Sequence, residues 1–436
     1  MGPTLPTASA ATFSLDMTTD HSIRRRENVG TGLIVVATLV SALAVLGYQA
    51  IASRTLGTDG FAPIAVLWTV MFLIYTVIQL PAEQHLTRAL VVTRETASLA
   101  RVRRDMLGAF AVGAAIGVGF VILTLDRFFD SNAWFIVITF GIMVSRSLMA
   151  AGRGSLAGHR RFSGYAATIA LEAVGLIAGG IVAAVLDLPT AAFAVVLVIA
   201  PLMTMLARPF AAIEGHGDAP QLEAQPGSFL VWLILATTAS QLIIAGGPIA
   251  VSFVGGTAAA VSIYFTSFAL LRGPVTSAYN LVARVLPDFT ELAQSDDPAR
   301  LWKWAPRITI AGLGLAVLGA IGSGLLLRPL IEVIYGEAFV PPQLAATLGG
   351  AGVGLGLGAL FATQLYSASA KGALLAAGWG AALVLSIGAL VLLDLDPVDR
   401  VAAAFVIGEG TGLILLGLVV PLLVVSKSHR LGEGHT

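Results

Sequence analysis

The sequence contains no cysteine and very little charge. Disulfides, thiolate metal sites and cysteine nucleophiles are therefore excluded. Only 11% of the residues are charged, whereas a soluble domain carries roughly 25%. The 25 basic and 25 acidic residues balance, so the net charge gives no indication of a nucleic-acid partner, and we expect none. We find no Walker loop, no HExxH, no GxSxG and no convincing metal cluster, so we expect neither a cofactor nor a metal.

Apolar residues, by contrast, make up 57% of the chain. A soluble fold of this length has no room to hide so much apolar surface, so we expect lipid to be the solvent. Long uncharged runs recur along the whole length, and each is close to the ~20 residues that span a bilayer. We predict an all-α polytopic membrane protein with about twelve transmembrane helices. The predicted spans are 29–53, 61–80, 106–125, 134–152, 164–186, 190–208, 229–254, 258–280, 307–327, 343–366, 372–393 and 398–425.

Residues 1–28 precede the first apolar run and are polar, with three arginines, Arg24 to Arg26, near their end. They resemble the n-region of a signal peptide, and Ala50-Ile51-Ala52 resembles a cleavage site. The run at 29–53 is nevertheless long enough to be a span and others follow it, so we predict a retained helix. We expect 1–28 to be a disordered cytoplasmic N-terminus, and both Met1 and Met17 fit as its start.

Lys and Arg are distributed unevenly between the loops. With the N-terminus inside, most of the 25 basic residues fall in inner segments, and the outer loops keep only Arg54, Arg127, Arg328 and Arg400. Basic residues in short loops stay on the cytoplasmic side. We therefore predict a multi-pass protein of the bacterial inner membrane with both termini in the cytoplasm, including a tail at 426–436.

The predicted spans divide into two groups of six. The segment 209–228 contains glycine and proline, is the longest weakly structured polar stretch between spans, and is predicted to be a cytoplasmic linker. It separates an N-terminal six-helix lobe at 29–208 from a C-terminal six-helix lobe at 229–425. Leu56-Gly57-Thr58 after the first span is similar to Gly255-Gly256-Thr257 after the seventh. This weak sequence similarity favours parallel repeats related by an axis along the membrane normal.

Four ionisable residues lie inside predicted spans: Arg272, Glu409, Glu172 and Arg146. A charge at the centre of a span costs roughly 2.5–3.5 kcal/mol on insertion scales and usually faces a cavity or a partner. Arg272 and Glu409 are predicted at similar depth, as are Arg146 and Glu172, which suggests two pairs. One interpretation is an anion site at the arginines and a proton- or cation-linked site at the glutamates. The other is structural ion pairing, or snorkelling in the case of Arg146.

Polar stripes follow the first two helices of each predicted lobe. Wettable faces at these matching positions predict a central hydrophilic cavity between the lobes. The alternative is hydrogen bonding between packed helices. The stripes are Thr38, Ser41, Val45 and Tyr48; Thr76, Gln79 and Glu83; Thr237, Gln241 and Ser252; and Ser262, Thr266, Gly273, Ser277 and Asn280.

Four stretches of the chain follow recognisable motifs. Ala52 to Phe61 follows R-x-L-G-x-x-x-[FY], Leu271 to Pro274 follows R-x-P, Val285 to Phe289 follows l-x-P, and Ile331 to Phe339 follows l-Y-G-x-x-F. These motifs resemble those of the polysaccharide-transporter (O-antigen flippase-like) branch of the multidrug/oligosaccharidyl-lipid/polysaccharide (MOP) flippase superfamily. Each motif is degenerate, and their order on the twelve-helix plan carries the resemblance, which covers about 28–425.

The resemblance implies a V-shaped pair of six-helix lobes around a central cavity, and no enzymatic reaction. It implies alternating-access movement of a polyprenyl-(pyro)phosphate-linked oligosaccharide from the inner to the outer leaflet, for cell-surface polysaccharide assembly. Membrane lipids and polysaccharide-assembly proteins are the implied partners. Arginine suits the phosphate because its planar fork binds bidentately. We predict that Arg272, Arg54, Gln241, Asn280, Thr38 and Tyr48 bind substrate, and that Glu409 and Glu172 couple transport to a proton or sodium ion.

Three other functional classes are alternatives to this one. An ion-coupled multidrug or small-solute exporter of the same superfamily remains open, because fold does not fix substrate. A major-facilitator symporter is disfavoured, since the loop from His85 to Arg104 lacks the G-x-x-x-D-[RK]-x-G-[RK] motif. A membrane-embedded glycosyltransferase or polymerase needs a larger outer loop with carboxylates. Asp394-Leu395-Asp396 has D-x-D spacing but sits in a very short turn, so we expect a polar turn there.

Overall fold

The structure is a computed structural model that describes residues 10–92, 96–159, 161–210, 227–294, 299–369 and 371–421. Nearly all of these residues are helical, and none of them forms a strand. The predicted linker at 209–228 is described only at its two ends, and the predicted tail at 426–436 lies outside the described residues. The all-α prediction is therefore confirmed.

The N-terminal group of helices runs from α1 to the 3-10 turn η2. Its members are α1 (Ala10–Ile74), the π-helical turn η1 (Tyr75–Gln79), α2 (Leu80–Val92), α3 (Thr96–Leu123), α4 (Leu125–Phe128), α5 (Trp134–Gly158), α6 (Phe162–Val185), α7 (Thr190–Met203) and η2 (Thr204–Ala207). In this group α6 packs on α1 and α7, and α5 packs on α2, α3 and α7. We call it the N lobe.

The C-terminal group, the C lobe, runs from α8 to the π-helical turn η4. Its members are α8 (Gly227–Ala245), α9 (Gly247–Phe253), α10 (Ala258–Gln294), α11 (Ala299–Trp302), α12 (Trp304–Tyr335), η3 (Glu337–Phe339), α13 (Gln343–Ala368), α14 (Gly372–Leu392), α15 (Pro397–Ile414) and η4 (Leu415–Val419). Here α13 packs on α10, α12 and α15, while α14 packs on α8 and α15.

Helix α1 contains the first predicted span and most of the second, 61–80, in one 65-residue element, and the second span continues through η1 to Leu80. The two arms join at Gly57, whose φ of 70° is non-helical and is open to glycine without steric cost. Residues 10–28, predicted to be disordered, form the first turns of α1. Neither proline nor glycine lies between Ala10 and Val29, so no breaker stops the helix there.

Each of the twelve predicted spans has a helical counterpart. Among the described residues, nine helices are long and apolar enough to cross a membrane, or ten if the bent pair α8–α9 is one span. One of the nine, Gly32–Glu83, is 52 residues long and holds two predicted spans, and Ala258–Gly273 of α10 is a shorter apolar helix. This pattern is that of a multi-pass membrane protein.

Glycine lets the helices of the C lobe approach closely. A Cβ at Gly312 would lie 3.0 Å from the Cα of Gly358, and one at Gly350 would collide with the backbone of Gly319. Both pairs join α12 to α13. Without a hydrophobic driving force between helices in lipid, such close contact supplies the van der Waals attraction that holds them.

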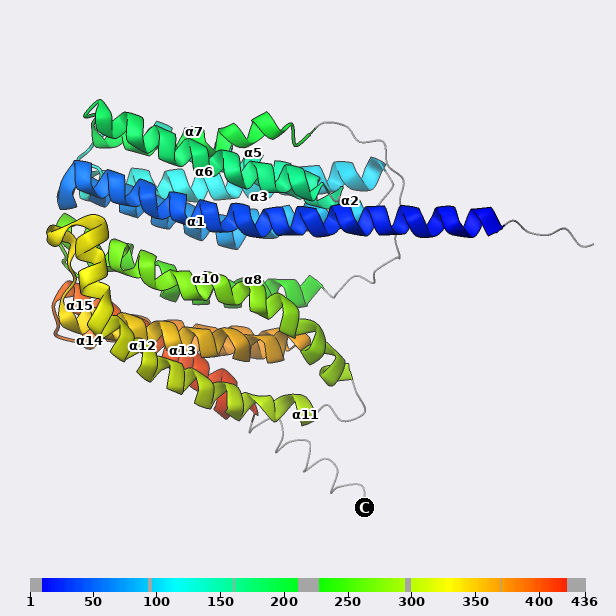
Figure 1. Cartoon of the computed structure of the whole chain (residues 1–436). Coiled ribbons are helices and arrows are strands. Elements are labelled where there is room, and N and C mark those ends of the chain that lie inside the picture. Colours follow the sequence, from blue (N-terminus) through cyan, green and yellow to red (C-terminus); the bar gives the residue numbers. More distant parts are fainter. Residues whose placement is uncertain are drawn as a thin grey trace, which may run out of the picture.

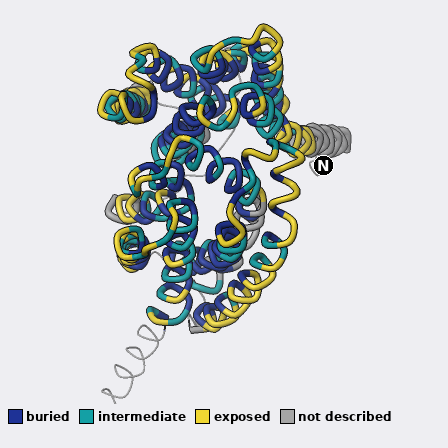
Figure 2. The backbone as a smooth tube through the Cα atoms, turned by 90° about the vertical axis from the view of Figure 1, so that its left-hand side faces the viewer, coloured by how far each residue is buried: buried dark blue, intermediate teal, exposed yellow. Residues whose placement is uncertain are grey.

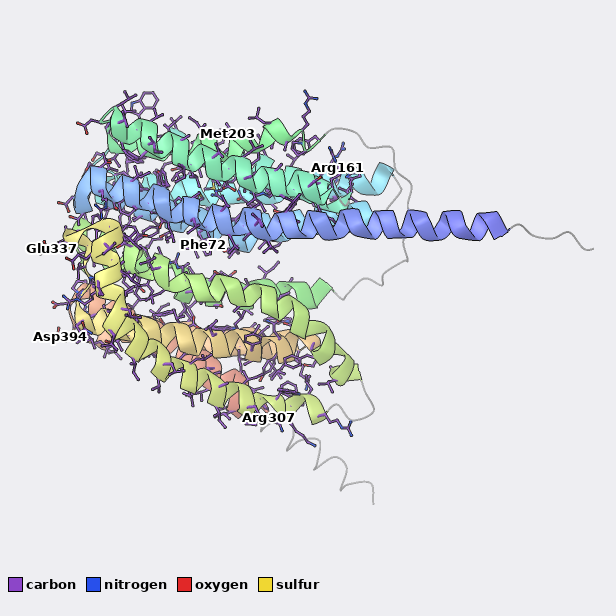
Figure 3. The ribbon with its side chains drawn as sticks, in the orientation of Figure 1. Phe72, Arg161, Met203, Arg307, Glu337 and Asp394 are labelled. Atoms are coloured by element: carbon purple, nitrogen blue, oxygen red, sulfur yellow. The ribbon has the colours of Figure 1, made fainter. Side chains whose placement is uncertain are left out.

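The two lobes meet at one end of the molecule, which we call the latch end, and diverge toward the opposite, terminal end (Figure 1). Figure 2 looks onto the latch end and shows buried backbone inside each lobe, with exposed residues around the outside. Figure 3 places Glu337 and Asp394 at the latch end, Arg161 and Arg307 toward the terminal end, and Phe72 between the lobes.

Candidate functional site

An arginine of the N lobe binds the end of a C-lobe helix at the latch end. The guanidinium of Arg54 donates from Nε to the carbonyl of Ile334 at 2.9 Å and from Nη2 to that of Val333 at 2.6 Å. These carbonyls belong to the last turn of α12, where helix carbonyls lack partners and the helix dipole is negative. Arg54 thus joins the lobes in this state, and its role in substrate binding stays a prediction.

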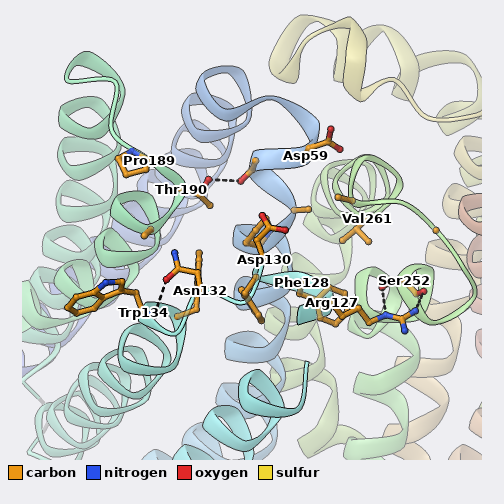
Figure 4. A pocket seen from close by; sticks show the side chains of 18 residues that line it. Asp59, Arg127, Phe128, Asp130, Asn132, Trp134, Pro189, Thr190, Ser252 and Val261 are labelled. Carbon is orange, nitrogen blue, oxygen red and sulfur yellow. Dashed lines mark hydrogen bonds between the residues drawn. The ribbon is translucent and has the colours of Figure 1, made fainter. Parts of the chain in front are cut away.

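Arg127 makes the same kind of contact to a second C-lobe helix (Figure 4). Its Nε donates to the Ser252 hydroxyl at 2.8 Å, and its Nη2 donates to the Ser252 carbonyl in the last turn of α9. The guanidinium also lies 4.8 Å from the ring centre of Phe253. A cavity of about 600 Å³ opens beside it, lined by both lobes, including Asp59 and Val261.

Further inter-lobe contacts gather at the same end. Tyr335 of α12 donates to Gln49 of α1 at 3.2 Å, and Ser262 of α10 donates to the carbonyl of Thr58 at 2.6 Å. The buried ring of Phe61 lies 5.9 Å from that of Phe265. These contacts, with those of Arg54 and Arg127, close the latch end with charge-assisted, neutral and aromatic interactions.

Arg272 sits where the seventh predicted span is broken. Helices α8 and α9 meet at a bend of 67°. Pro248 has no N–H, so it leaves the carbonyl of Ile244 without its helical donor. The Arg272 Nη2 lies 3.4 Å from this carbonyl and from that of Ala245. The guanidinium therefore interacts with the exposed C-terminal end of α8.

The same arginine reaches the N lobe. Its guanidinium carbon lies 5.6 Å from the ring centre of Phe72, so a half-buried cation stands between the lobes. Its neighbour Tyr264 is buried and stacks on Phe268 at 4.0 Å. A Cβ at Gly247 would collide with the Tyr264 ring, so glycine is required at the start of α9. Arg272 thus lies at the break between α8 and α9, where close packing leaves little room for change.

Glu409 is fully buried in the C lobe. Neither of its carboxyl oxygens has a hydrogen-bond partner among the described residues, and Gly356 of α13 leaves room for the side chain. Phe268 and Phe405 are in ring contact at 5.3 Å, and Arg272 and Glu409 lie one helical turn further along their helices. The similar depth predicted for these two residues agrees with this contact. The predicted ion pair is wrong, since no bond joins their described side chains.

The N lobe contains the second predicted pair and extends it. Glu172 accepts from Arg146 at 3.3 Å through Oε1 and from Arg153 at 2.8 Å through Oε2. Because both oxygens are engaged by buried guanidiniums, the geometry favours the structural ion-pair interpretation over ion coupling at Glu172. Sequence reasoning missed Arg153, although it lies two turns beyond Arg146 on one helix and so shares its face.

The remaining predicted site residues have different surroundings. Tyr48 is fully buried and donates to the carbonyl of Phe193 at 2.7 Å, so it packs inside the N lobe and the predicted cavity position is corrected. Thr38 is exposed and donates to its own helix at Ile34. Gln241 is buried on α8, one turn before the break. The side chain of Asn280 lies outside the described residues.

Comparison with known proteins gives a structural likeness only. No protein-family model and no curated protein matches this chain. An inward-facing multidrug resistance MATE family transporter of the MOP superfamily aligns with 91% of this chain and 99% of its own, at a TM-score of 0.64 and 13% identity. An outward-facing multidrug resistance MATE family transporter of the MOP superfamily aligns with 91% of this chain and 94% of its own, at a TM-score of 0.56 and 13% identity. A MATE protein in complex with MaL6 aligns with 91% of this chain and 95% of its own, at a TM-score of 0.52 and 14% identity. This likeness shows a two-lobed MOP-type fold.

Proposed function

We propose that this chain, which has the fold of MOP-superfamily transporters, exports an amphipathic organic anion across the bacterial inner membrane by alternating access, driven by an ion gradient. The observation that carries the proposal is the placement of Arg272, a half-buried cation between two lobes that are latched at one end. A transporter of this kind carries its substrate without chemical change, so we propose no enzymatic reaction.

The orientation follows from charge. Arg161 and Arg307 lie toward the terminal end (Figure 3), together with the basic segments that the sequence predicts to be cytoplasmic. The latch end then faces outward, and the lobes diverge toward the cytoplasm. The higher TM-score to the inward-facing form, 0.64 against 0.56, supports this assignment. The structure would thus be the state that receives substrate from the inside.

The sign of the charge argues for an anionic substrate. A guanidinium in a low-dielectric region attracts an anion and repels a cation, and its fork matches carboxylate, sulfonate or phosphate groups. The structural neighbours are named as multidrug transporters, which supports export of amphipathic compounds more than it supports the lipid-linked oligosaccharide expected from the sequence. An anionic amphiphile satisfies both the charge and the apolar surroundings.

The joint between α8 and α9 offers a route from substrate binding to opening. Arg272 stabilises the break by bonding to the carbonyls of Ile244 and Ala245, and α9 carries Ser252, the latch partner of Arg127. An anion that draws the guanidinium away removes those bonds and changes the pose of α9. The Arg127 contact then weakens at the latch end.

Glu409 is the proposed coupling group of the C lobe. It is fully buried, has no hydrogen-bond partner among the described residues and lies at the depth of Arg272. A carboxyl in such surroundings is costly as an anion, so it changes state together with a bound proton or sodium ion. Its occupancy is thereby linked to the conformation of the lobe.

A lipid-linked oligosaccharide flippase is the second candidate, favoured by one observation. Arg272 faces the N-lobe residue Phe72, so a phosphate head group would bind between the lobes while its polyprenyl chain stayed in lipid. The two candidates share a recognition chemistry, an anionic head on an apolar body. They differ in whether the apolar part leaves the bilayer.

The proposal is tested with purified protein in proteoliposomes and three fluorescent substrates. These are a soluble anionic amphiphile, a soluble cationic amphiphile and a short-chain polyprenyl-phosphate sugar. Gradient-driven movement of the soluble anion supports the exporter, and movement of only the lipid-linked sugar between leaflets supports the flippase. Movement of only the cation refutes both. Arg328→Ala is the matched control for Arg272→Ala, because Arg328 is an exposed arginine of the same lobe that bonds to Gln343.

A further inference from the structure

A cavity in the N lobe, separate from the region around Arg272, ends on a buried carboxyl group. Its volume is about 380 Å³. Its wall is mainly apolar, with Ile34, Leu80, Ala157 and Phe162, and its polar part consists of Glu83, Thr87 and Tyr165. It lies between α1, α2, α5 and α6, next to the ends of α5 and α6 that Arg161 marks as the terminal end (Figure 3).

Only one of the two carboxyl oxygens of Glu83 has a hydrogen-bond partner among the described residues. The residue is 5% exposed, and its Oε1 accepts a hydrogen bond from the Tyr165 hydroxyl at 3.1 Å. Its Oε2 is buried and has no hydrogen-bond partner among the described residues. A buried carboxylate oxygen without a partner carries a large desolvation cost, whereas a protonated one needs only a single acceptor or a water.

The neighbouring charges favour the ionised form of Glu83. Arg146 and Arg153 share one carboxylate, Glu172, which leaves one positive charge in excess. Glu83 is the group that balances this charge, and the Arg153 guanidinium lies 6.0 Å from the ring of Tyr165, which binds Glu83. Burial opposes ionisation of Glu83 and the cationic excess supports it, so the two effects act on this carboxyl in opposite directions.

The groups around Glu83 come from each element packed on it. Helix α5 contributes Arg153, α6 contributes Tyr165 and Glu172, and η1 contributes Tyr75. Helix α3 presents the buried Met106, and α1 presents Ile34 to the cavity. Of these, Arg153 is the cation that acts on Glu83, and Arg146 lies 5.7 Å from the ring centre of Tyr75.

We propose that Glu83 is a proton-exchange site that opens to the cytoplasmic side in this state. The inference rests on the proposed transport function and deepens it, because it names the proton as the coupling ion and gives the N lobe its own carboxyl. In the opposite state the carboxylate takes up a proton from the outer side and becomes a neutral carboxyl. In this state the proton leaves Oε2 to water in the cytoplasmic cavity, and the carboxylate is restored.

Protonation changes how α2 is held. The ionised carboxylate attracts Arg153 of α5, and neutralisation removes this attraction and leaves the cluster with a net positive charge. The two helices are already in close contact, since a Cβ at Gly154 would lie 2.9 Å from the Glu83 carbonyl. A change in attraction at this contact therefore alters the packing of α2 on α5, which links protonation to the shape of the N lobe.

Infrared difference spectroscopy tests the site without relying on transport. Purified protein in lipid is stepped between acidic and basic buffer, and the carboxyl C=O stretching band is recorded. The proposal predicts a titrating band that is lost in Glu83→Gln, kept in Glu409→Gln and shifted in Tyr165→Phe. If the titrating bands of folded Glu83→Gln are the same as those of the wild-type protein, the proposal is overturned. So does a Glu83 band that responds to sodium at constant pH, which indicates a sodium site.

Two further measurements separate this inference from the proposed function. Glu83→Asp keeps the carboxyl and is predicted to shift the band, so it replaces Glu83→Gln if the latter fails to fold. In proteoliposomes, one pH unit supports about tenfold accumulation per coupled proton. Glu83→Gln is predicted to lose this accumulation and keep substrate exchange without a gradient. If no substrate is transported but the Glu83 band titrates, the transport proposal fails and the proton site stands.

Discussion

Removing the two latch arginines is predicted to open the latch end. The double variant Arg54→Ala/Arg127→Ala deletes four hydrogen bonds to the ends of α9 and α12. Those carbonyls then face water at the latch end, so the loss falls on the closed state and not on the open one. We expect the population to move toward a state in which the lobes separate here.

The size of the shift follows from the exposure of each arginine. Arg54 is exposed, so its two bonds are screened and contribute about 1 kcal/mol in total. Arg127 is also exposed, but it lies over the ring of Phe253 in addition to making two hydrogen bonds, so we assign it about 1–2 kcal/mol. The sum of about 2–3 kcal/mol corresponds to a change of about one and a half to two orders of magnitude in the conformational equilibrium.

Pulsed electron paramagnetic resonance measures this directly. The chain has no cysteine, so spin labels at Leu186→Cys and Leu392→Cys, exposed at the latch ends of α6 and α14, need no background removal. The double variant is predicted to show a second, longer distance. Arg400→Ala is the control, because Arg400 lies at the same end but bonds within its own lobe to Leu395. An unchanged distance distribution in the folded double variant refutes the latch.

Three further outcomes are expected. Gly247→Ala drives a methyl group into Tyr264 and costs about 1–3 kcal/mol of stability, measured as a lower thermal midpoint, whereas Gly322→Ala, with open space around it, leaves the midpoint unchanged. Glu172→Gln leaves two buried guanidiniums without their carboxylate and destabilises the protein by about 3–5 kcal/mol, and an unaltered thermal midpoint contradicts this. Glu409→Gln keeps the fold and uncouples transport from the ion gradient, so a wild-type response to pH and sodium argues against the coupling role.

The sequence was sufficient for the helices and their pairing into lobes. Hydropathy located the spans because each apolar run has to cross the same thickness of lipid. It also placed Arg146 beside Glu172, since depth in a span is a matter of counting residues. The break at Pro248 was visible as a proline within a span, but its consequence was not, because sequence does not show which cation reaches the freed carbonyl of Ile244.

Some predicted site residues have surroundings in this state that sequence reasoning did not predict, and the cause is the same for each. The direction in which a side chain points from its helix depends on how the helix packs. Sequence periodicity predicts that direction only loosely. Tyr48 follows a polar spacing yet packs against Phe193, and Arg54 matches a family motif yet binds a helix end of the other lobe. The proposed pair of Arg272 with Glu409 had the right depth and the wrong direction, because depth alone does not place two side chains face to face.

The central question for this protein is whether an anion at Arg272 releases the contacts of Arg54 and Arg127 at the latch end. The labels at Leu186→Cys and Leu392→Cys are measured in lipid with and without an anionic amphiphile. We predict that the amphiphile lengthens the latch-end distance in the otherwise wild-type protein, and that Arg272→Ala abolishes this response while Arg328→Ala keeps it. An equal response in Arg272→Ala, or a response only to a cationic amphiphile, would contradict it.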